Sequence, residues 1–286
     1  MNLSYALLAL TTIICLFTRN RSLMLFSILA TTASGLFQGM INLTGLFSIL
    51  FFFVLCKIFF SFKNLTKLAK VLLFTVITLF VIAFTFHMIP GFSNSLVIDK
   101  IQVSELSCPF SMYLNFDKVL AALIIYTTSN LCILEKPISR KSALQALFYC
   151  LLCVSFILTP GLLSGYIEYD PKLPDILWIW VLNNLLFVCM GEEVIFRGFL
   201  QSSLKVFLKK KPYAVHLSII ISSIVFGLAH FKGGIIYVIL ASVCGWFYGY
   251  IYEKTNRILC SILVHFELNL VHLIIFTYPA SINMFK

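Results

Sequence analysis

The sequence contains few charged residues, and this scarcity excludes most classes of protein. Only 11% of the 286 residues are charged, with 11 acidic and 21 basic side chains. Soluble domains have about 25% charged residues, so a chain of this length could not cover a soluble surface. Disorder requires low hydrophobicity, whereas 60% of these residues are hydrophobic and the mean hydropathy is +1.00. The composition therefore predicts a multi-pass integral membrane protein.

Several catalytic signatures and a disulfide framework are also absent. The sequence has no HExxH zinc motif, no GxSxG elbow and no Walker loop. The nine cysteines are odd in number and mostly lie in apolar runs, where they are expected to act as small hydrophobic residues. The net charge of +10 comes from short basic clusters between apolar runs, so it predicts no nucleic-acid partner.

Ten apolar runs are present, and a helix of about 20 apolar residues can cross the hydrocarbon of a bilayer. We therefore predict an all-α, polytopic membrane helix bundle with about eight to ten transmembrane helices. Every second connector is basic, which the positive-inside rule predicts for ten spans with the N-terminus outside. The runs cover about 3–18, 22–40, 43–62, 71–89, 118–134, 143–165, 175–196, 213–231, 235–252 and 258–278.

The longest polar stretch, about 90–117, divides the chain into two groups of helices. The N-terminal group, residues 1–116, carries no motif that we recognise. The C-terminal bundle, residues 117–286, carries the polar residues that are costly in a membrane. Its ninth run has small residues at four-residue spacing, a pattern suited to close helix packing; these are Ala241, Gly245 and Gly249.

Two adjacent carboxylates, Glu192 and Glu193, interrupt the seventh apolar run. A charge at the centre of a membrane helix costs about 2.5–3.5 kcal/mol, so such residues are candidates for function. Glu193 and Arg197 stand four residues apart, which predicts an ion pair on one helix face. Glu192 points about 100° away and would face a cavity as a general base. The alternative is a purely structural ion-pair cluster.

Two histidines and an asparagine follow in later apolar runs. His230, among Gly, Ala and Phe, would by itself be interpreted as a hydrogen-bonded core histidine. His265 and Asn269 share a helix face with His272, and a polar packing stripe is the alternative for that face. Together with Glu192, these imidazoles and the amide form a site suited to water activation and oxyanion stabilisation.

The order of these motifs resembles the CAAX protease and bacteriocin-processing (CPBP) family of intramembrane endopeptidases. The motifs are Glu-Glu-x-x-x-Arg, Phe-x-x-x-His and His-x-x-x-Asn, and the resemblance covers about 175–275. It implies a membrane helix bundle around a polar cavity in which a peptide bond is hydrolysed. By motif position it implies that Glu192 activates water, His230 helps to hold that water, and His265 with Asn269 stabilises the oxyanion. By the same motif positions, the resemblance implies that Glu193 and Arg197 support the site.

The resemblance leaves the cofactor open. The glutamate mechanism requires none, whereas a metalloprotease would need a divalent metal such as zinc, held by Glu192, His230 and His265. We favour the glutamate mechanism because Asn269 is a poor zinc ligand. The expected partners are the lipid bilayer and a peptide or protein substrate, such as a prenylated protein or a secreted-peptide precursor.

Two other functions fit parts of the pattern. One is a non-proteolytic membrane scaffold or bacteriocin-immunity protein of the same fold. The other is a proton-coupled transporter, in which buried Glu and His relay protons. A transporter more often has repeated halves and broken helices, which this sequence lacks.

The distances of Glu192 and His230 from the basic cluster at 209–211 predict how deep each lies in the membrane. Glu192 lies 17 residues before Lys209, and His230 lies 19 residues after Lys211. At about 1.5 Å per residue these two rises are nearly equal, provided that the helix of Glu192 continues towards Leu208. The apolar run, however, ends at residue 196, so the two expectations conflict.

Overall fold

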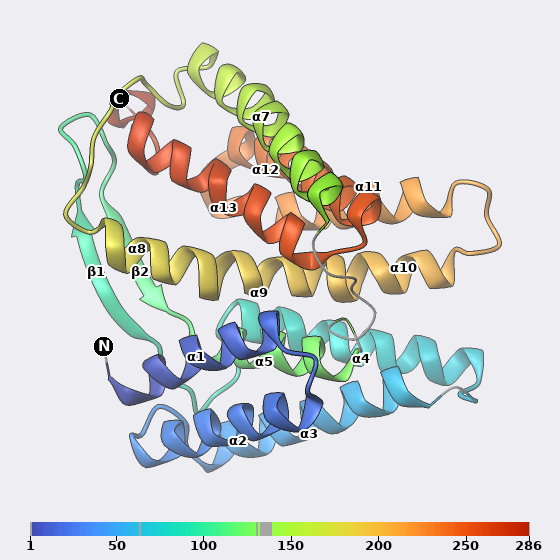
Figure 1. Ribbon diagram of the computed structural model, residues 1–286. Coiled ribbons are helices and arrows are strands. Elements are labelled where there is room, and N and C mark those ends of the chain that lie inside the picture. The colour runs from blue at the N-terminus through green and yellow to red at the C-terminus, as the bar shows by residue number, and fades with distance from the viewer. Residues whose placement is uncertain (1, 63, 130, 132–138, 286) are drawn as a thin grey trace. The chain divides into compact units, whose positions relative to one another are not determined.

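The computed structural model describes residues 2–62, 64–129, 131 and 139–285, which form ten long helical segments and two short strands (Figure 1). The fold is the predicted polytopic bundle of apolar helices. Two compact units are present, and each is made of several stretches of chain. The division predicted at residue 116 is drawn from the positions of the sequence motifs. Unit 1 contains Met1–Ser95, Leu114–Glu135 and Leu186–Phe199, and unit 2 contains Leu96–Tyr113, Lys136–Leu185 and Leu200–Lys286.

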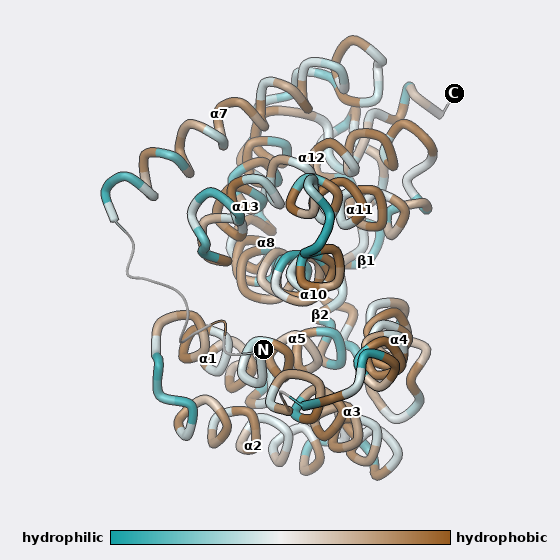
Figure 2. The backbone as a smooth tube through the Cα atoms, turned by 90° about the vertical axis from the view of Figure 1, so that its right-hand side faces the viewer, coloured by the Kyte–Doolittle hydropathy of each residue, from teal (hydrophilic) through white to brown (hydrophobic). Residues whose placement is uncertain are grey.

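Helices long and apolar enough to cross a membrane make this a multi-pass integral membrane protein. Hydrophobic residues dominate the helices, and hydrophilic ones gather in turns such as that between α1 and α2 (Figure 2). Each predicted run coincides with a helix, although residues 130 and 132–134 of the fifth run lie outside the described residues. Among the described residues, six helices meet the length and hydropathy criteria, at Leu43–Ser61, Lys67–Thr85, Arg140–Leu163, Leu177–Phe207, Phe231–Thr255 and Ile258–Ile275.

Unit 1 is built around one buried helix. This helix, α5, is buried at every residue from Phe116 to Thr128, and the four helices that precede it in the chain each pack against it. From Val119 to Ile125 every residue of this helix is apolar, as expected for a helix with no solvent-exposed face. The surrounding helices are α1 (Leu3–Phe17), α2 (Arg21–Phe37), α3 (Leu43–Ser61) and α4 (Lys67–Thr85).

Hydrogen bonds between side chains join α1 to α2. The Thr11 hydroxyl lies 2.8 Å from the Thr31 hydroxyl and donates to the Ser27 carbonyl oxygen at 3.1 Å. Nearer the other end, the Ser4 hydroxyl donates to Gln38 Oε1 at 2.9 Å. Such bonds supplement packing between membrane helices, where lipid offers no polar alternative.

Unit 2 contains four further long helices, and small residues allow two of them to approach closely. A Cβ built on Gly245 would lie 3.0 Å from Ser223 Cα, and one on Gly249 would lie 3.3 Å from Ile219 Cγ2. The predicted small-residue face is therefore confirmed as a packing surface. The helices are α7 (Arg140–Leu163), α11 (Ala214–Leu228), α12 (Gly234–Thr255) and α13 (Ile258–Ile275).

The polar stretch 90–117 contains a two-stranded sheet that the sequence analysis missed. The strands are β1 (Ser95–Ile101) and β2 (Phe110–Leu114). Ile98 and Met112 from the hairpin form a buried cluster with Trp180 and Leu273. Ile98 is the one buried residue of β1, so the strand lacks the sustained alternation by which strands are recognised.

The segment that follows α7 is tied to the chain beyond α13. The Asp170 backbone N–H donates to the Ile275 carbonyl oxygen at 2.9 Å. The Asp170 carboxylate accepts hydrogen bonds from the Ser104 hydroxyl and from the Lys172 ammonium, whose nitrogen lies 3.1 Å from Oδ2. The Lys172 ammonium also donates to the Phe276 carbonyl oxygen. The Asp170 carboxylate thus joins this segment to Ser104, and Lys172 joins it to the chain after α13.

Asp170→Asn is expected to remove a pH-dependent part of the stability. Burial alone raises the pKa of Asp170, but the Ser104 hydroxyl and the Lys172 ammonium together hold the pKa below its ordinary 3.8. A carboxyl with a lowered folded-state pKa stabilises the fold above its unfolded pKa, and this contribution disappears as the pH falls through the folded value. Thermal unfolding in detergent should show wild type above the variant at neutral pH, with the difference shrinking below about pH 4. Asp175→Asn, an exposed carboxyl of the same segment, is the control. A difference that does not change with pH contradicts this account.

Candidate active site

One continuous helix, Leu177–Phe207, carries the two adjacent glutamates. It runs through α8 (Leu177–Asn183), a π-helical stretch Asn184–Cys189, α9 (Met190–Glu193), a second π-helical stretch Val194–Gln201 and α10 (Ser202–Phe207). The glutamates of α9 thus lie between two stretches of π-helix. Such irregular turns are frequent at functional sites.

The expected end of this helix at residue 196 is wrong, and the continuation towards Leu208 is confirmed. Polar residues after 196 suggested an end, but neighbouring groups satisfy them. The Gln201 amide donates to the Gly249 carbonyl oxygen at 3.1 Å. The Lys205 ammonium pairs with the Glu253 carboxylate at 2.8 Å. Since polar side chains that bond across helices need not face lipid, they do not end the helix.

Glu193 and Arg197 form the predicted ion pair. Arg197 Nε lies 3.1 Å from Glu193 Oε2, and both side chains are 0% exposed. The guanidinium carbon also lies 5.7 Å from the centre of the Phe196 ring. Two opposite charges buried in contact can remain in an apolar helix, whereas either alone could not.

Glu192 has an ion-pair partner that the sequence analysis did not identify. The Lys118 ammonium, from the first turn of α5, lies 2.7 Å from Glu192 Oε1. The two side chains are 9% and 11% exposed. Lys118 opens the fifth apolar run, where a lysine is ordinarily interpreted as an interfacial residue. No spacing rule connects positions 118 and 192, so only the fold reveals this contact.

His230 lies in the turn after α11 and not inside the helix, where the sequence analysis placed it. The helix ends at Leu228, and the His230 backbone N–H closes a turn onto the Gly227 carbonyl oxygen at 2.9 Å. His230 Nδ1 lies 2.7 Å from the Phe226 carbonyl oxygen. Because a carbonyl only accepts, Nδ1 carries the proton and Nε2 is the acceptor nitrogen of the neutral ring. The bond thereby fixes the tautomer as well as the position.

Gly227→Ala is expected to destabilise the fold beside His230. A Cβ at position 227 would lie 1.9 Å from Ser242 Oγ and 2.6 Å from the Val238 carbonyl oxygen. The hydroxyl can rotate away, but the carbonyl belongs to the backbone of α12, so the two helices must separate. Overpacking of this kind costs about 1–3 kcal/mol. Thermal unfolding in detergent measures the loss. Gly191→Ala is the matched control, because its Cβ would meet nothing closer than 4.0 Å; equal losses in both variants contradict the steric account.

His265 and Asn269 lie on the predicted shared face of α13. His265 has an aromatic neighbour, and Asn269 has an amide neighbour. The His265 ring stacks on Tyr248, with centroids 4.5 Å apart and planes at 15°. The Asn269 amide donates to Asn184 Oδ1 at 3.2 Å. His272, the next residue of the stripe, lies with Nε2 3.1 Å from the Thr277 carbonyl oxygen. His272 is thus held by a backbone carbonyl that follows the helix.

The fold divides the candidate residues between the two units. His230 and His265 lie in unit 2 and contact the same ring, that of Phe226, at centroid distances of 4.7 and 5.8 Å. Asn269 belongs to the same unit, as does its hydrogen-bond partner Asn184. The remaining three, Glu192, Glu193 and Arg197, belong to unit 1.

The metal alternative gains no support from clustered side chains. Within the described part of the chain, no group of three or more His, Cys, Asp or Glu side chains is arranged to hold a metal ion.

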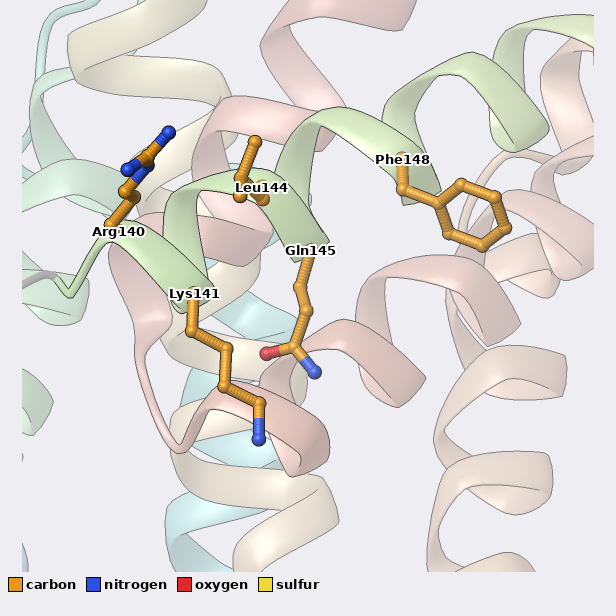
Figure 3. Close-up of a pocket in the computed structure, with 5 residues that line it drawn as sticks. All are labelled: Arg140, Lys141, Leu144, Gln145 and Phe148. Carbon is orange, nitrogen blue, oxygen red and sulfur yellow. The ribbon is translucent and has the colours of Figure 1, made fainter.

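A pocket of about 460 Å³ lies along α7 and is lined from that single helix (Figure 3). Because one helix forms its lining, it is a surface hollow and not an enclosed site. Its lining residues are Arg140, Lys141, Leu144, Gln145 and Phe148.

Comparison with known proteins identifies one similarity. Residues 174–271 match the family model of the type II CAAX prenyl endopeptidase Rce1-like proteins. The match confirms the resemblance predicted for about 175–275, and all six predicted site residues lie inside it. No curated protein and no solved structure matches the chain. Lys118 lies outside the matched residues.

Proposed function

We propose that the protein is an intramembrane endopeptidase that hydrolyses peptide bonds with water activated by Glu192. The observation that carries the proposal is the position of Glu192, a carboxylate only 8% exposed in a helix long enough to span a membrane. The match of residues 174–271 to an endopeptidase family supports the reaction class. A buried carboxylate is costly in such a helix and is a functional candidate by default.

The proposed reaction assigns one role to each candidate residue. The Glu192 carboxylate takes a proton from water as the water oxygen attacks the peptide carbonyl carbon, and His230 holds that water. His265 and Asn269 stabilise the oxyanion of the tetrahedral intermediate. The Glu192 carboxyl then returns its proton to the leaving nitrogen as the C–N bond breaks.

The positive charge beside Glu192 argues against a metal-dependent version of this reaction. The Lys118 ammonium lies 2.7 Å from Glu192 Oε1, so a metal ion bound by Glu192 would lie close to another positive charge. Asn269 is also a poor ligand for zinc, which prefers Cys, His and carboxylate. We therefore derive no step through a metal bound by Glu192, His230 and His265.

The proposed substrate is a peptide segment that enters from the bilayer. Prenylated proteins are suggested by the name of the matching family, and secreted-peptide precursors are the second class. Both present a flexible segment next to a lipid-anchored or apolar one. A polar cavity within the membrane would have to admit this segment together with water.

Cleavage of a quenched peptide library by the detergent-purified protein tests the proposal. Turnover by wild type, lowered by about 10²-fold or more in Glu192→Gln prepared in parallel, is the expected result. Turnover that persists with a chelator supports the metal-free reaction, and turnover that the chelator abolishes contradicts it. Equal signals from both proteins would point to contamination or to a different base.

One observation favours a non-proteolytic scaffold as the second candidate. Both glutamates are paired with cations, Glu192 with Lys118 and Glu193 with Arg197, as in a structural cluster. In a scaffold, Glu192→Gln would accumulate normally and keep the protein's role. The same variant therefore separates the two functions.

A further inference from the structure

We infer that Lys118 is a positioning residue that holds the Glu192 carboxylate for water activation; this inference rests on the function proposed above. The contact places part of the proposed machinery in the N-terminal half of the chain. Lys118 lies outside residues 174–271, which match the endopeptidase family. It acts through Glu192 and does not itself touch the reacting atoms.

The contact between Lys118 and Glu192 is direct, and both side chains are almost fully buried. Lys118 Nζ lies 2.7 Å from Glu192 Oε1, and the two side chains are 9% and 11% exposed. The lysine stem runs past Gly191, where an added Cβ would lie 4.0 Å from Lys118 Cε. Charge-assisted hydrogen bonds at this separation are short, and they fix geometry better than neutral ones. One of the two carboxylate oxygens is thus held, which fixes the direction of the other.

The position of Lys118 is unfavourable apart from this contact. An ammonium is expensive to bury unless it is paired. Lys118 also lies in the first turn of α5, where the positive end of the helix dipole disfavours a cation. Among the hydrogen bonds of the described residues, the one made by Lys118 Nζ is to Glu192. The carboxylate therefore offsets costs that a leucine at this position would avoid.

The adjacent acid does not compete for the lysine ammonium, because other donors hold it. The Asp117 carboxylate is 1% exposed and lies 2.9 Å from His87 Nδ1. Asn94 Nδ2 donates to the same carboxylate at 3.1 Å, and the Lys118 backbone N–H donates to it at 2.8 Å. The Phe116 backbone N–H in turn donates to Asn94 Oδ1 at 2.7 Å.

This network fixes the first turn of α5. Asp117 favours a helix N-terminus, and two of its donors, His87 and Asn94, anchor it to the chain before β1. The backbone of Lys118 is thereby held, and its stem reaches Glu192 from a rigid origin. A base positioned in this way keeps its geometry between turnovers, which matters because small displacements from the attacking geometry cost about 10²-fold in rate.

The test compares Lys118→Met, Lys118→Arg and Lys205→Met in the cleavage assay. Lys118→Met keeps the stem and removes the charge, so kcat should fall about 10²-fold with little change in KM. Lys118→Arg retains a cation and should recover part of kcat. Lys205→Met removes a Lys–Glu pair of similar length, 2.8 Å, in unit 2, and should leave kcat within about twofold of wild type because surface pairs contribute little.

A stability cycle separates the failure of this inference from the failure of the proposed function. Melting temperatures of wild type, Lys118→Met, Glu192→Gln and the double variant should be non-additive, because contacting charges couple. Additive shifts overturn the contact and the inference with it. Wild-type kcat in Lys118→Met, when Glu192→Gln is inactive, overturns the positioning role alone. Absence of turnover in wild type would overturn the proposed function, and with it the role of Lys118, even where the cycle supports the contact.

Discussion

Glu192→Gln is expected to lower kcat/KM by about 10²–10⁴-fold, the range for loss of a general base, while the protein remains folded. The amide keeps the shape of the side chain but cannot take a proton from water. Its oxygen can still accept the hydrogen bond that Lys118 now donates at 2.7 Å. Because the Lys118 ammonium loses its counter-charge, the melting temperature should also fall, but the protein that remains folded should show the loss of activity, and both are measured on the same detergent preparation.

Glu253→Gln is the matched control for this substitution. Glu253 is also paired with a lysine, Lys205, at 2.8 Å, but it lies outside the proposed machinery. It should retain wild-type turnover. Wild-type kcat/KM in Glu192→Gln would contradict the role of Glu192 as base, and pH-dependent uptake altered by Glu192→Gln would instead indicate a transporter.

The helices and the local charge pairs of this protein follow from short-range rules. Apolar runs near 20 residues predicted the helices, and four-residue spacing predicted the pair of Glu193 and Arg197. Small residues at the same spacing predicted the close approach of α11 and α12 at Gly245. In each case the physical cause acts within one helix turn or one hydrophobic stretch, so one segment of sequence contains all the information.

The tertiary contacts of the candidate residues depend on long-range folding. Lys118 meets Glu192 across 74 positions of sequence, and Asn184 meets Asn269 across 85. The end of the helix after residue 196 was also misjudged, because the partners of Gln201 and Lys205 lie on α12. His230 falls outside its helix for a local reason, a turn closed onto Gly227. Polar residues in a membrane protein therefore mark either a helix end or a tertiary contact, and the sequence alone does not distinguish these.

Removing one member of the Glu193–Arg197 pair should have the largest effect on stability. Both side chains are 0% exposed, so Glu193→Ala or Arg197→Ala leaves a buried charge without its partner. Loss of one partner of a buried pair costs about 3–5 kcal/mol. The yield of folded protein and the melting temperature in detergent should both fall, as measured by size-exclusion chromatography and thermal unfolding.

The paired replacement Glu193→Leu with Arg197→Met distinguishes charge from packing. Apolar residues of similar size often replace a buried ion pair without loss of stability, so this double variant should recover folded yield that both single variants lack. Lys205→Ala, from a pair whose side chains are 38% and 25% exposed, should change stability by less than about 1 kcal/mol. Normal accumulation of both single variants would contradict the supporting role of the pair. Recovery of folding in the double variant without recovery of cleavage would mean that the pair also orients Glu192, because stability alone would then not explain its presence.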